Sequence, residues 1–394
     1  VYRTNMDHNR PYGSFGTKEH ALAGRQIAEE GIVLLKNDRN VLPVNLNKVK
    51  KILVVGENAV KKMTVGGGSS SLKAKYEVSP LAGIQSRVGK DAEVTYVQGY
   101  ASPAVKEQDV KDAKVPEQEK IDYAALREEA VKAAKGADVV FVVGGLNKND
   151  NQDCEGDDRK SLGLPYEQDE LIAALSKVVV VLVTGNAVAM PWIKNVPSVV
   201  EAWYGGTEAG NAIASILFGD VNPSGKLPFT FPVKLEDNSA HALGEYPGDG
   251  ENVTYKEGIF VGYRWADKQK SKPLFPFGHG LSYTTFDYGK AVADKKVISK
   301  DDQITFTVTL SNVGNRPGAE TVQLYIGDKK SSLPRPVKEL KGFKKVYLTA
   351  GEQKEVSFTI DKEALSFYDD TKGQWVVEPG KFEAYIGASS GDIR

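Results

Sequence analysis

The chain has 394 residues, and 51 Lys and Arg against 52 Asp and Glu leave a net charge of -1. This length allows two to three domains with buried cores, and the balanced charge excludes a global basic field that would attract nucleic acid or anionic lipid. A single cysteine and four scattered histidines exclude an internal disulfide and argue against a metal site, so we expect no metal and no other cofactor. The longest apolar run, near residues 178–183, is too short to cross a bilayer, so we expect neither a membrane nor a nucleic-acid partner.

Residues 17–232 alternate between segments typical of helices and segments typical of strands. Continuous apolar runs, such as DVVFVVG at 138–144, indicate strands covered on both faces, as in a mainly parallel sheet. Strands are predicted at 51–56, 94–97, 138–144, 178–185, 198–204 and 227–231, and helices at 18–30, 80–88, 122–135, 165–175 and 207–218. The pattern therefore predicts a doubly wound α/β domain, with helices on both faces of one sheet in three layers.

Residues 233–281 are rich in Pro, Gly and aromatic residues. We expect them to form a strap packed between two domains, because aromatic side chains favour burial over a flexible linker. Beyond the strap, apolar and polar side chains alternate over 303–310, 322–326 and 356–360. Residues 282–394 are thus predicted to form an all-β sandwich of the immunoglobulin or fibronectin kind.

The candidate site is an acidic loop, residues 150–159, that follows the predicted strand at 138–144. Loops at the carboxyl ends of buried parallel strands are where open α/β sheets bind ligands. Glu155 is the candidate acid, and Arg159 is near enough in sequence to hold or tune it. The alternative is a solvated acidic turn without a chemical role. Its five acidic residues are Asp150, Asp153, Glu155, Asp157 and Asp158.

Three other motifs match functional signatures only in part. The Gly/Ser run at 66–71 suggests a phosphate loop, but the sequence contains no Gly-Lys-Ser/Thr. A surface loop is the simpler interpretation of that run, and a loop shaping a sugar pocket is the functional alternative. GASSG at 387–391 spells a serine-hydrolase elbow but falls in a predicted terminal strand with no helix after it. His279 has no catalytic partner at a fixed spacing, which favours a structural, hydrogen-bonding histidine.

Six segments of the chain form an ordered set. They are EEGIVLLKN (29–37), GGGSS (66–70), SPLAGI (79–84), EAWY (201–204), LFGDVNPSGKLP (217–228) and FPFGHGLSYTTF (275–286). Together they resemble the second and third domains of glycoside hydrolase family 3, and the resemblance extends from about Tyr12 to near the end of the chain. It implies an (α/β)6 sandwich followed by a fibronectin type III-like domain, in agreement with the patterns above.

The resemblance also implies an activity and a set of site residues. Family members that are exo-acting β-glucosidases or their relatives hydrolyse terminal β-linked sugars with retention, using two carboxyl groups. Glu155 matches the family's general acid/base, and Ser69, Ser70 and Arg159 become candidates for substrate binding. Cys154 departs from the pattern, in which serine or threonine precedes the glutamate, and Asp157 stands where an aromatic residue is usual.

The second carboxyl group is missing from this sequence. In the family it is an aspartate on a preceding TIM barrel, in a Ser-Asp-Trp type segment, and neither this segment nor the sugar-binding Lys-His pair occurs here. Retaining hydrolysis needs two carboxyl groups about 5–5.5 Å apart, so Glu155 cannot act alone. We expect residues 1–16 to be a connector from that barrel, and the chain to be the C-terminal part of a larger enzyme, inactive without the barrel.

The expected partners are a β-linked glucoside or oligosaccharide and the N-terminal TIM barrel of the same enzyme, with a homodimer left open. The family suggests a periplasmic or secreted location. A β-xyloside is the alternative substrate. A non-catalytic carbohydrate-binding or scaffold fragment is the alternative function, and it predicts sugar binding without a barrel. A nucleotide-binding module is disfavoured by the absent phosphate-loop lysine.

Overall fold

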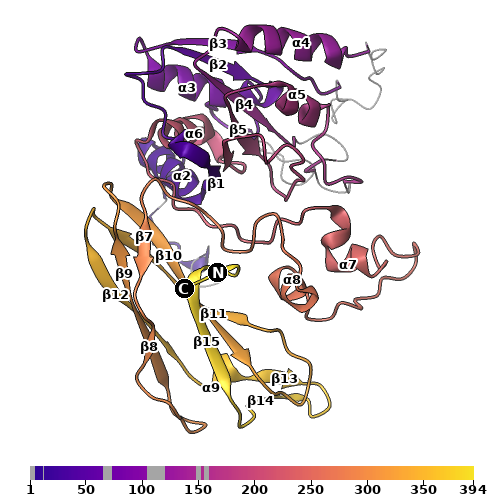
Figure 1. The fold of residues 1–394 in the computed structure, drawn as a ribbon, viewed down its shortest axis with the longest axis vertical. Helices are drawn as coiled ribbons and strands as arrows, with labels where there is room; N and C mark the ends of the chain where they lie inside the picture. The colour runs from indigo at the N-terminus through magenta and orange to yellow at the C-terminus, as the bar shows by residue number, and fades with distance from the viewer. Residues whose placement is uncertain (1–4, 12, 65–72, 104–119, 148–151, 155–158) are drawn as a thin grey trace.

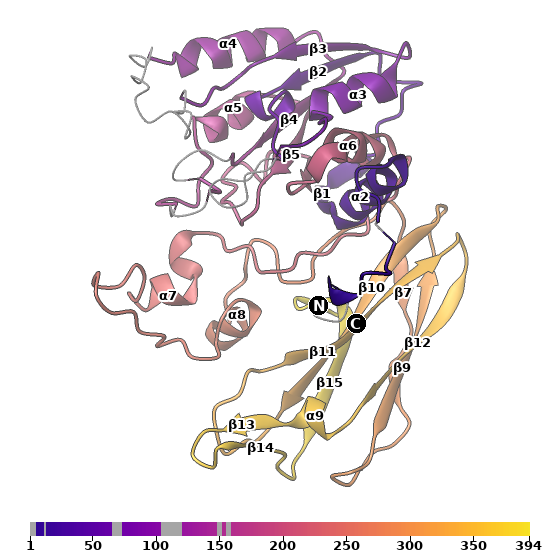
Figure 2. The ribbon, with the colours of Figure 1, turned by 180° about the vertical axis from the view of Figure 1, so that it is seen from behind.

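The computed structural model describes residues 5–11, 13–64, 73–103, 120–147, 152–154 and 159–394. An α/β unit and a β-sandwich lie at opposite ends of the long axis, and a segment carrying the short helices α7 (Ser239–Ala242) and α8 (Tyr263–Gln269) projects to one side between them (Figures 1 and 2). Among these residues, none of the helices combines the length and the apolar character needed to span a bilayer.

The α/β unit is built on a six-stranded sheet with the strand order β1-β6-β5-β4-β2-β3. All neighbouring strands are parallel except β1, which runs antiparallel to β6. The strands are β1 (Val33–Asn37), β2 (Lys51–Val55), β3 (Glu93–Val97), β4 (Val139–Gly145), β5 (Val178–Val183) and β6 (Ser198–Glu201). The chain passes from β2 to its neighbour β3 on one side and then returns to β4, which lies on the other side of β2. The strand order therefore reverses between β2 and β4, and such a switch point is where open α/β sheets bind ligands.

Helices cover both faces of this sheet and give each face its own core. Along β4, Val139, Phe141 and Val143 pack on the side of α3 (Pro80–Val88) and α6 (Ala209–Phe218). Val140 and Val142 face α4 (Tyr123–Ala134) and α5 (Gln168–Ala174). The remaining long helix, α2 (Lys18–Gly31), packs beside α6. The side-chain alternation of a strand buried on both sides explains the continuous apolar runs of the sequence.

Local sequence signals set the ends of the helices. Ser79 caps α3 by accepting a hydrogen bond from the Ala82 N–H, and Pro80 occupies the first turn, where its missing N–H costs nothing. Helices α3 and α6 cross closely because both carry a glycine at the crossing. A Cβ on Gly83 would lie 2.0 Å from the Gly210 carbonyl oxygen. Shorter helices are η1 (Asp38–Asn40), η2 (Glu57–Ala59), η4 (Gly206–Glu208), η5 (Leu235–Asp237) and α9 (Lys362–Leu365).

The β-sandwich consists of two antiparallel sheets, β11-β10-β15-β16 and β12-β9-β7 with β8 paired to β9. Its core is formed by alternating apolar side chains such as Val308, Leu324 and Phe358, as the period of two predicts. The strands of these two sheets are β7 (Phe286–Tyr288), β8 (Val292–Ala293), β9 (Ile304–Asn312), β10 (Gly318–Asp328), β11 (Glu339–Leu348), β12 (Gln353–Ile360), β15 (Phe382–Ser389) and β16 (Asp392–Ile393). A separate two-stranded sheet is formed by β13 (Phe367–Asp369) and β14 (Gln374–Val376). The fold class predicted from the sequence, α/β followed by all-β, is confirmed.

Several elements differ from the sequence prediction, among them β6, which ends at Glu201 rather than at 204. The edge strand β1 was not predicted, because its short run directly follows a helix. The strand predicted at 227–231 is absent: Phe231 makes only an isolated bridge to Phe275, and Pro228 supplies no N–H for a ladder. Helix α5 begins at Gln168 rather than at 165, because Tyr166 and Glu167 adopt φ of 63° and 53°.

The strap at 233–281 is packed only in part. Trp265 and Phe275 are buried as expected, whereas Tyr255 is 78% exposed. His279 has the structural role predicted for it, since its Nε2 lies 2.8 Å from the Leu35 carbonyl oxygen. The GASSG segment runs from β15 into the paired strand β16, whereas a hydrolase elbow turns from a strand into a helix, so it is not such an elbow.

Candidate active site

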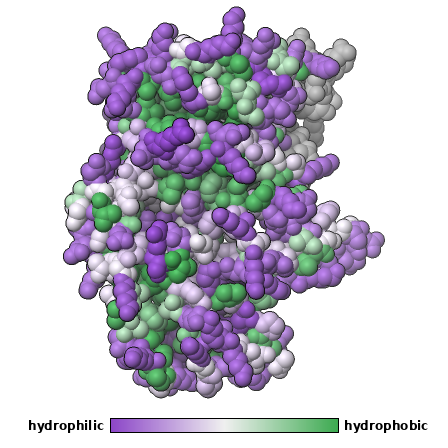
Figure 3. Space-filling view, in the orientation of Figure 1, coloured by the Kyte–Doolittle hydropathy of each residue, from purple (hydrophilic) through white to green (hydrophobic). Residues whose placement is uncertain are grey.

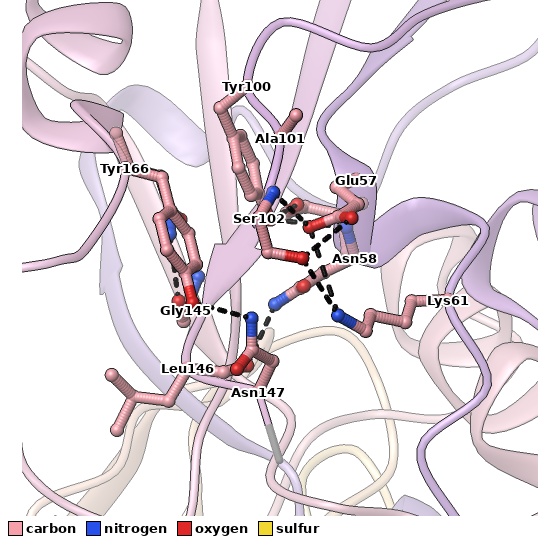
Figure 4. A network of polar contacts seen from close by, with 12 residues as sticks. Glu57, Asn58, Lys61, Tyr100, Ala101, Ser102, Gly145, Leu146, Asn147 and Tyr166 are labelled. Carbon is pink, nitrogen blue, oxygen red and sulfur yellow. Dashed lines mark hydrogen bonds and ion pairs between the residues drawn. The ribbon is translucent and has the colours of Figure 1, made fainter. Parts of the chain in front are cut away.

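The switch point between β2 and β4 is joined by a buried hydrogen-bond network (Figure 4). Asn58, in η2 after β2, donates from Nδ2 to the Leu146 carbonyl oxygen, 3.0 Å away, just beyond β4. The Asn58 N–H donates to the Tyr100 hydroxyl at 3.1 Å, and that hydroxyl donates to the Val143 carbonyl oxygen at 3.1 Å. The carboxyl ends of the two strands are therefore tied together by one amide and one phenol.

A second group of contacts continues the network towards solvent. Ser102 donates from its N–H and its hydroxyl to the Glu57 carboxylate, at 3.0 and 2.9 Å, and Lys61 donates to the same hydroxyl at 3.1 Å (Figure 4). On the other side of β4, the Gln168 side-chain amide pairs with both backbone groups of Gly145, at 2.8 and 2.9 Å. The rim of the switch point is thus held by polar contacts from three separate segments.

Gly145 ends β4 in a conformation that requires glycine. Its φ is 119°, and a Cβ would lie 2.4 Å from the Val183 carbonyl oxygen. That carbonyl accepts the Leu146 N–H at 3.0 Å, so the chain leaves the sheet against the end of β5. The acidic loop begins a few residues later.

The described residues before position 155 are anchored by Asp153. Its Oδ2 accepts from the Gly185 N–H at 2.6 Å and from the Tyr204 hydroxyl at 2.7 Å, and its Oδ1 accepts from Asn186 Nδ2 at 2.9 Å. Burial and the adjacent carboxylate raise the pKa of Tyr204 well above its usual range, so its hydroxyl stays a donor. Asp153 therefore fastens the loop to segments that follow β5 and β6.

The residue after the undescribed stretch 155–158 is anchored at the same place. Arg159 donates from Nη2 to the Ala187 carbonyl oxygen at 2.7 Å. Burial lowers the pKa of Arg159, an effect that the nearby charge of Asp153 opposes. Both flanks of 155–158 are thus hydrogen-bonded to the three-residue loop 185–187.

A buried carboxyl group, Glu201, lies under this loop at the end of β6. Burial raises the pKa of Glu201 well above its usual range. Thr184 Oγ1 lies 2.8 Å from the Asn186 carbonyl oxygen and 3.0 Å from Glu201 Oε2, and one hydroxyl proton cannot serve both acceptors. A protonated Glu201 resolves the conflict by donating to the hydroxyl. Its other oxygen accepts the N–H of Trp203, which is held at φ 56°.

Several predicted site residues fall outside the described part of the chain. Glu155, Ser69, Ser70 and Asp157 are among the residues that the structure does not describe. Arg159 and Cys154 are described, and Cys154 is a free thiol. Within the described residues, no group of three or more His, Cys, Asp or Glu side chains is arranged to hold a metal ion.

Sequence reasoning missed Asp153 and Tyr204 as specific participants. Asp153 was one of five acids in the loop, and Tyr204 was only the last letter of EAWY. The signal available was that each follows a buried strand at the same edge of the sheet. Their contact joins positions 51 residues apart, which no spacing rule predicts.

A cleft of about 740 Å³ opens beside the anchored loop. Its lining includes Asp153, Arg159 and Asn186, and also Thr230 and His241 from the segment after β6. A larger cavity of about 1030 Å³ lies at the opposite, amino-terminal end of the strands. Because parallel sheets bind ligands at the carboxyl ends of their strands, the smaller cleft is the better candidate.

Comparison with known proteins agrees with this architecture. Residues 32–283 match the model of the glycosyl hydrolase family 3 C-terminal domain, and residues 320–390 match a fibronectin type III-like domain. The chain belongs to glycosyl hydrolase family 3. The resemblance drawn from the six ordered segments is thereby confirmed.

Family 3 relatives align with nearly the whole chain. The β-glucosidase BoGH3A of Bacteroides ovatus is 51% identical over 100% of this chain and 53% of its own length. A β-xylosidase of Formosa agariphila is 39% identical over 95% of this chain and 49% of its own length. The crystal structure of a family 3 β-glucosidase from Bifidobacterium adolescentis superposes with a TM-score of 0.85, at 35% identity, over 99% of this chain and 54% of that one. The chain therefore spans about half the length of these relatives.

Proposed function

We propose that this chain is the C-terminal part of a retaining, exo-acting β-glucosidase, acting on terminal non-reducing β-D-glucosyl residues. Glu155 is the proposed general acid/base, and the nucleophilic aspartate lies on a separate N-terminal TIM barrel. The observation that carries the proposal is the anchoring of both flanks of 155–158, by Asp153 and Arg159, onto one loop at the carboxyl edge of the sheet. A solvated acidic turn has no need for such fixation.

The proposed roles follow from retaining chemistry. In the first step Glu155 gives a proton to the glycosidic oxygen while the barrel aspartate attacks the anomeric carbon, forming a glycosyl-enzyme. In the second step Glu155 takes a proton from water, which displaces the aspartate. Ser69, Ser70 and Arg159 are proposed sugar contacts, and Arg159 also fixes the loop through its hydrogen bond to the Ala187 carbonyl oxygen.

The test uses the full-length enzyme, with its N-terminal part present. Glu155→Ala should lower kcat/KM about 10²–10⁴-fold for phenyl β-glucoside, whose leaving group needs a proton. The loss should be much smaller for 2,4-dinitrophenyl β-glucoside, whose leaving group departs unaided. The matched control is Asp157→Ala, which removes another carboxylate of the same loop and should keep most of the activity. Unchanged rates for Glu155→Ala on both substrates would overturn the proposal.

Two alternatives are separable from the main proposal. The name of the Formosa relative favours testing 4-nitrophenyl β-D-xyloside beside the glucoside, and a higher kcat/KM for the xyloside would make the chain part of a β-xylosidase. A non-catalytic carbohydrate-binding fragment would bind glucose or cellobiose in calorimetry, while Glu155→Ala would leave hydrolysis by the full-length protein unchanged.

A further inference from the structure

The two-stranded sheet β13–β14 lies at the end of the sandwich away from the α/β unit (Figures 1 and 2). Tyr368 and Trp375 stand directly opposite each other in this sheet, and their side chains are 52% and 69% exposed. Their ring centroids are 5.7 Å apart and their ring planes meet at 72°. The pair therefore presents two aromatic rings to solvent as the two sides of a corner.

The inner face of β13 holds this pair on a rigid base. Phe367 lies under the Arg335 guanidinium, which is 5.3 Å from the centroid of the ring. Arg335 is buried and forms ion pairs with Asp328 at 3.3 Å and with Glu339 at 3.1 Å. Both carboxylates belong to strands of the sandwich, so the small sheet is attached to the body of the domain.

The turn between the two strands is fixed by the buried carboxylate of Asp369. This carboxylate accepts hydrogen bonds from the N–H and the hydroxyl of Thr371, at 3.1 and 2.6 Å, and forms an ion pair with Lys372 at 2.6 Å. These contacts hold the strands in register and fix the backbone under both rings. A ligand therefore loses little affinity to the ordering of this surface.

The apolar surface of the pair is too small for a stable protein partner. Within residues 361–381, all of which the structure describes, Tyr368 and Trp375 are the only large apolar side chains that are exposed. Two aromatic side chains bury about 150–250 Å² each, whereas a specific protein interface needs about 800 Å² from each partner. On the face that Figure 3 shows, hydrophilic side chains separate the apolar areas of the sandwich. The pair fits a ligand that offers one or two rings.

A β-D-glucosyl residue has a surface that suits such rings. All of its ring substituents are equatorial, so each face of the pyranose presents only C–H groups, which pack on an aromatic ring without burying a hydroxyl group. The hydroxyl groups point outward from the rim of the sugar, where water and the exposed polar residues Asp370 and Gln374 are available. In an α-linked glucan the axial bond at each anomeric carbon obstructs one face of the sugar.

We propose that Tyr368 and Trp375 form a binding site for a β-linked glucan chain. Trp375, the more exposed ring, stacks on a glucosyl residue, and Tyr368 contacts the same residue from the side, at the 72° corner. The choice of ligand rests on the proposed function, which the β-glucosidases among the family relatives support. Binding at this site keeps the enzyme on the polymer whose terminal glucosyl residues it releases.

The test is affinity electrophoresis of the full-length enzyme in native gels that contain barley β-glucan, a neutral and soluble β-linked polymer. Retardation measured against polymer concentration gives the Kd. Trp375→Ala should raise this Kd about 10-fold and Tyr368→Ala about 3-fold, because each variant loses one aromatic contact. Trp375→Phe, which keeps a ring, should retain most of the binding. The matched control is Phe343→Ala, which removes a 67% exposed aromatic residue from β11 of the same sandwich and should leave the Kd unchanged.

Three results would overturn the inference. The first is the same Kd for Trp375→Ala and Phe343→Ala. The second is equal retardation of the wild type by barley β-glucan and by dextran, an α-linked glucan. The third is a wild-type dimer that becomes a monomer in Trp375→Ala during sedimentation, which would assign the rings to a contact between two copies.

Two further measurements keep the result interpretable. The Tm of each variant reports its folding, and Trp375→Gln, which replaces the ring with a polar side chain, takes the place of Trp375→Ala if that variant is less stable than the control. The gels need no turnover and are repeated with Glu155→Ala. A glucan-binding protein that cleaves no β-glycoside would refute the proposed function and leave the binding site intact. An active enzyme whose retardation does not depend on Trp375 would refute the binding site alone.

Discussion

Asp153 offers the sharpest test of the anchored loop. Its carboxylate accepts three hydrogen bonds, from Gly185, Asn186 and Tyr204. Asp153→Ala removes all three. Water can replace the acceptor for Gly185 and Asn186, which are exposed, so each bond is worth about 1 kcal/mol net rather than the larger value of a buried charged pair. The expected loss is about 3 kcal/mol.

This loss is measurable in two independent ways. At about 2–4 °C per kcal/mol for a unit of this size, the Tm of Asp153→Ala should fall by about 6–12 °C. A loop displaced by about 1 Å at the acid/base should also lower kcat/KM for phenyl β-glucoside about 10²-fold in the full-length enzyme. Asp153→Asn keeps one oxygen acceptor and should show a smaller effect on both quantities.

The matched control is Asp122→Ala. Asp122 caps α4 with a single hydrogen bond from the Ala125 N–H, at 2.9 Å, away from the cleft. Its replacement should cost about 1 kcal/mol and leave kcat/KM unchanged. If Asp153→Ala lowers the Tm and kcat/KM no more than Asp122→Ala does, the anchoring argument is wrong.

Three further predictions concern the fold. Burial raises the pKa of Glu201 above the unfolded value near 4.5, so the stability that its protonated form contributes is complete below pH 4.5 and is lost as the pH rises. In urea unfolding, Glu201→Gln should therefore be as stable as wild type at pH 4 and more stable than wild type at pH 8. A difference in stability that does not depend on pH would contradict this. Burial lowers the pKa of His279 below 6.5, so the stability that the neutral imidazole contributes is complete above pH 6.5 and is lost as the pH falls. Wild type should therefore lose stability relative to His279→Gln between pH 7 and pH 5. Parallel curves of unfolding free energy against pH for the two proteins would contradict this. Gly83→Ala places a Cβ 2.0 Å from a carbonyl oxygen of α6 and should lower the free energy of unfolding by at least about 1–3 kcal/mol, measured by thermal unfolding. The control Gly136→Ala, whose Cβ would have no atom within 4 Å, should leave the free energy of unfolding unchanged. Equal losses for the two variants would refute the close crossing of α3 and α6.

Local pattern was enough for most of the fold. Strands buried on both faces must be apolar throughout, and half-exposed strands must alternate, so β4 and β5 on one side and β9 and β10 on the other are readable from single segments. The strand predicted at 227–231 failed because its pairing depends on a distant partner, Phe275, and not on its own residues. The edge strand β1 was missed for the same reason, since it pairs with β6 and with Leu281, both distant in the sequence.

For the candidate site, the sequence by itself determined that an acidic loop follows a buried strand and, through six ordered segments, that the chain resembles family 3. Only the tertiary structure decided that Asp153 and Arg159 meet the same three-residue loop, and that Glu201 is a buried carboxyl group beneath it. The physical reason is that hydrophobic periodicity is a property of neighbouring residues, whereas a hydrogen bond between Asp153 and Tyr204 exists only once the sheet has brought the ends of separate strands to one edge.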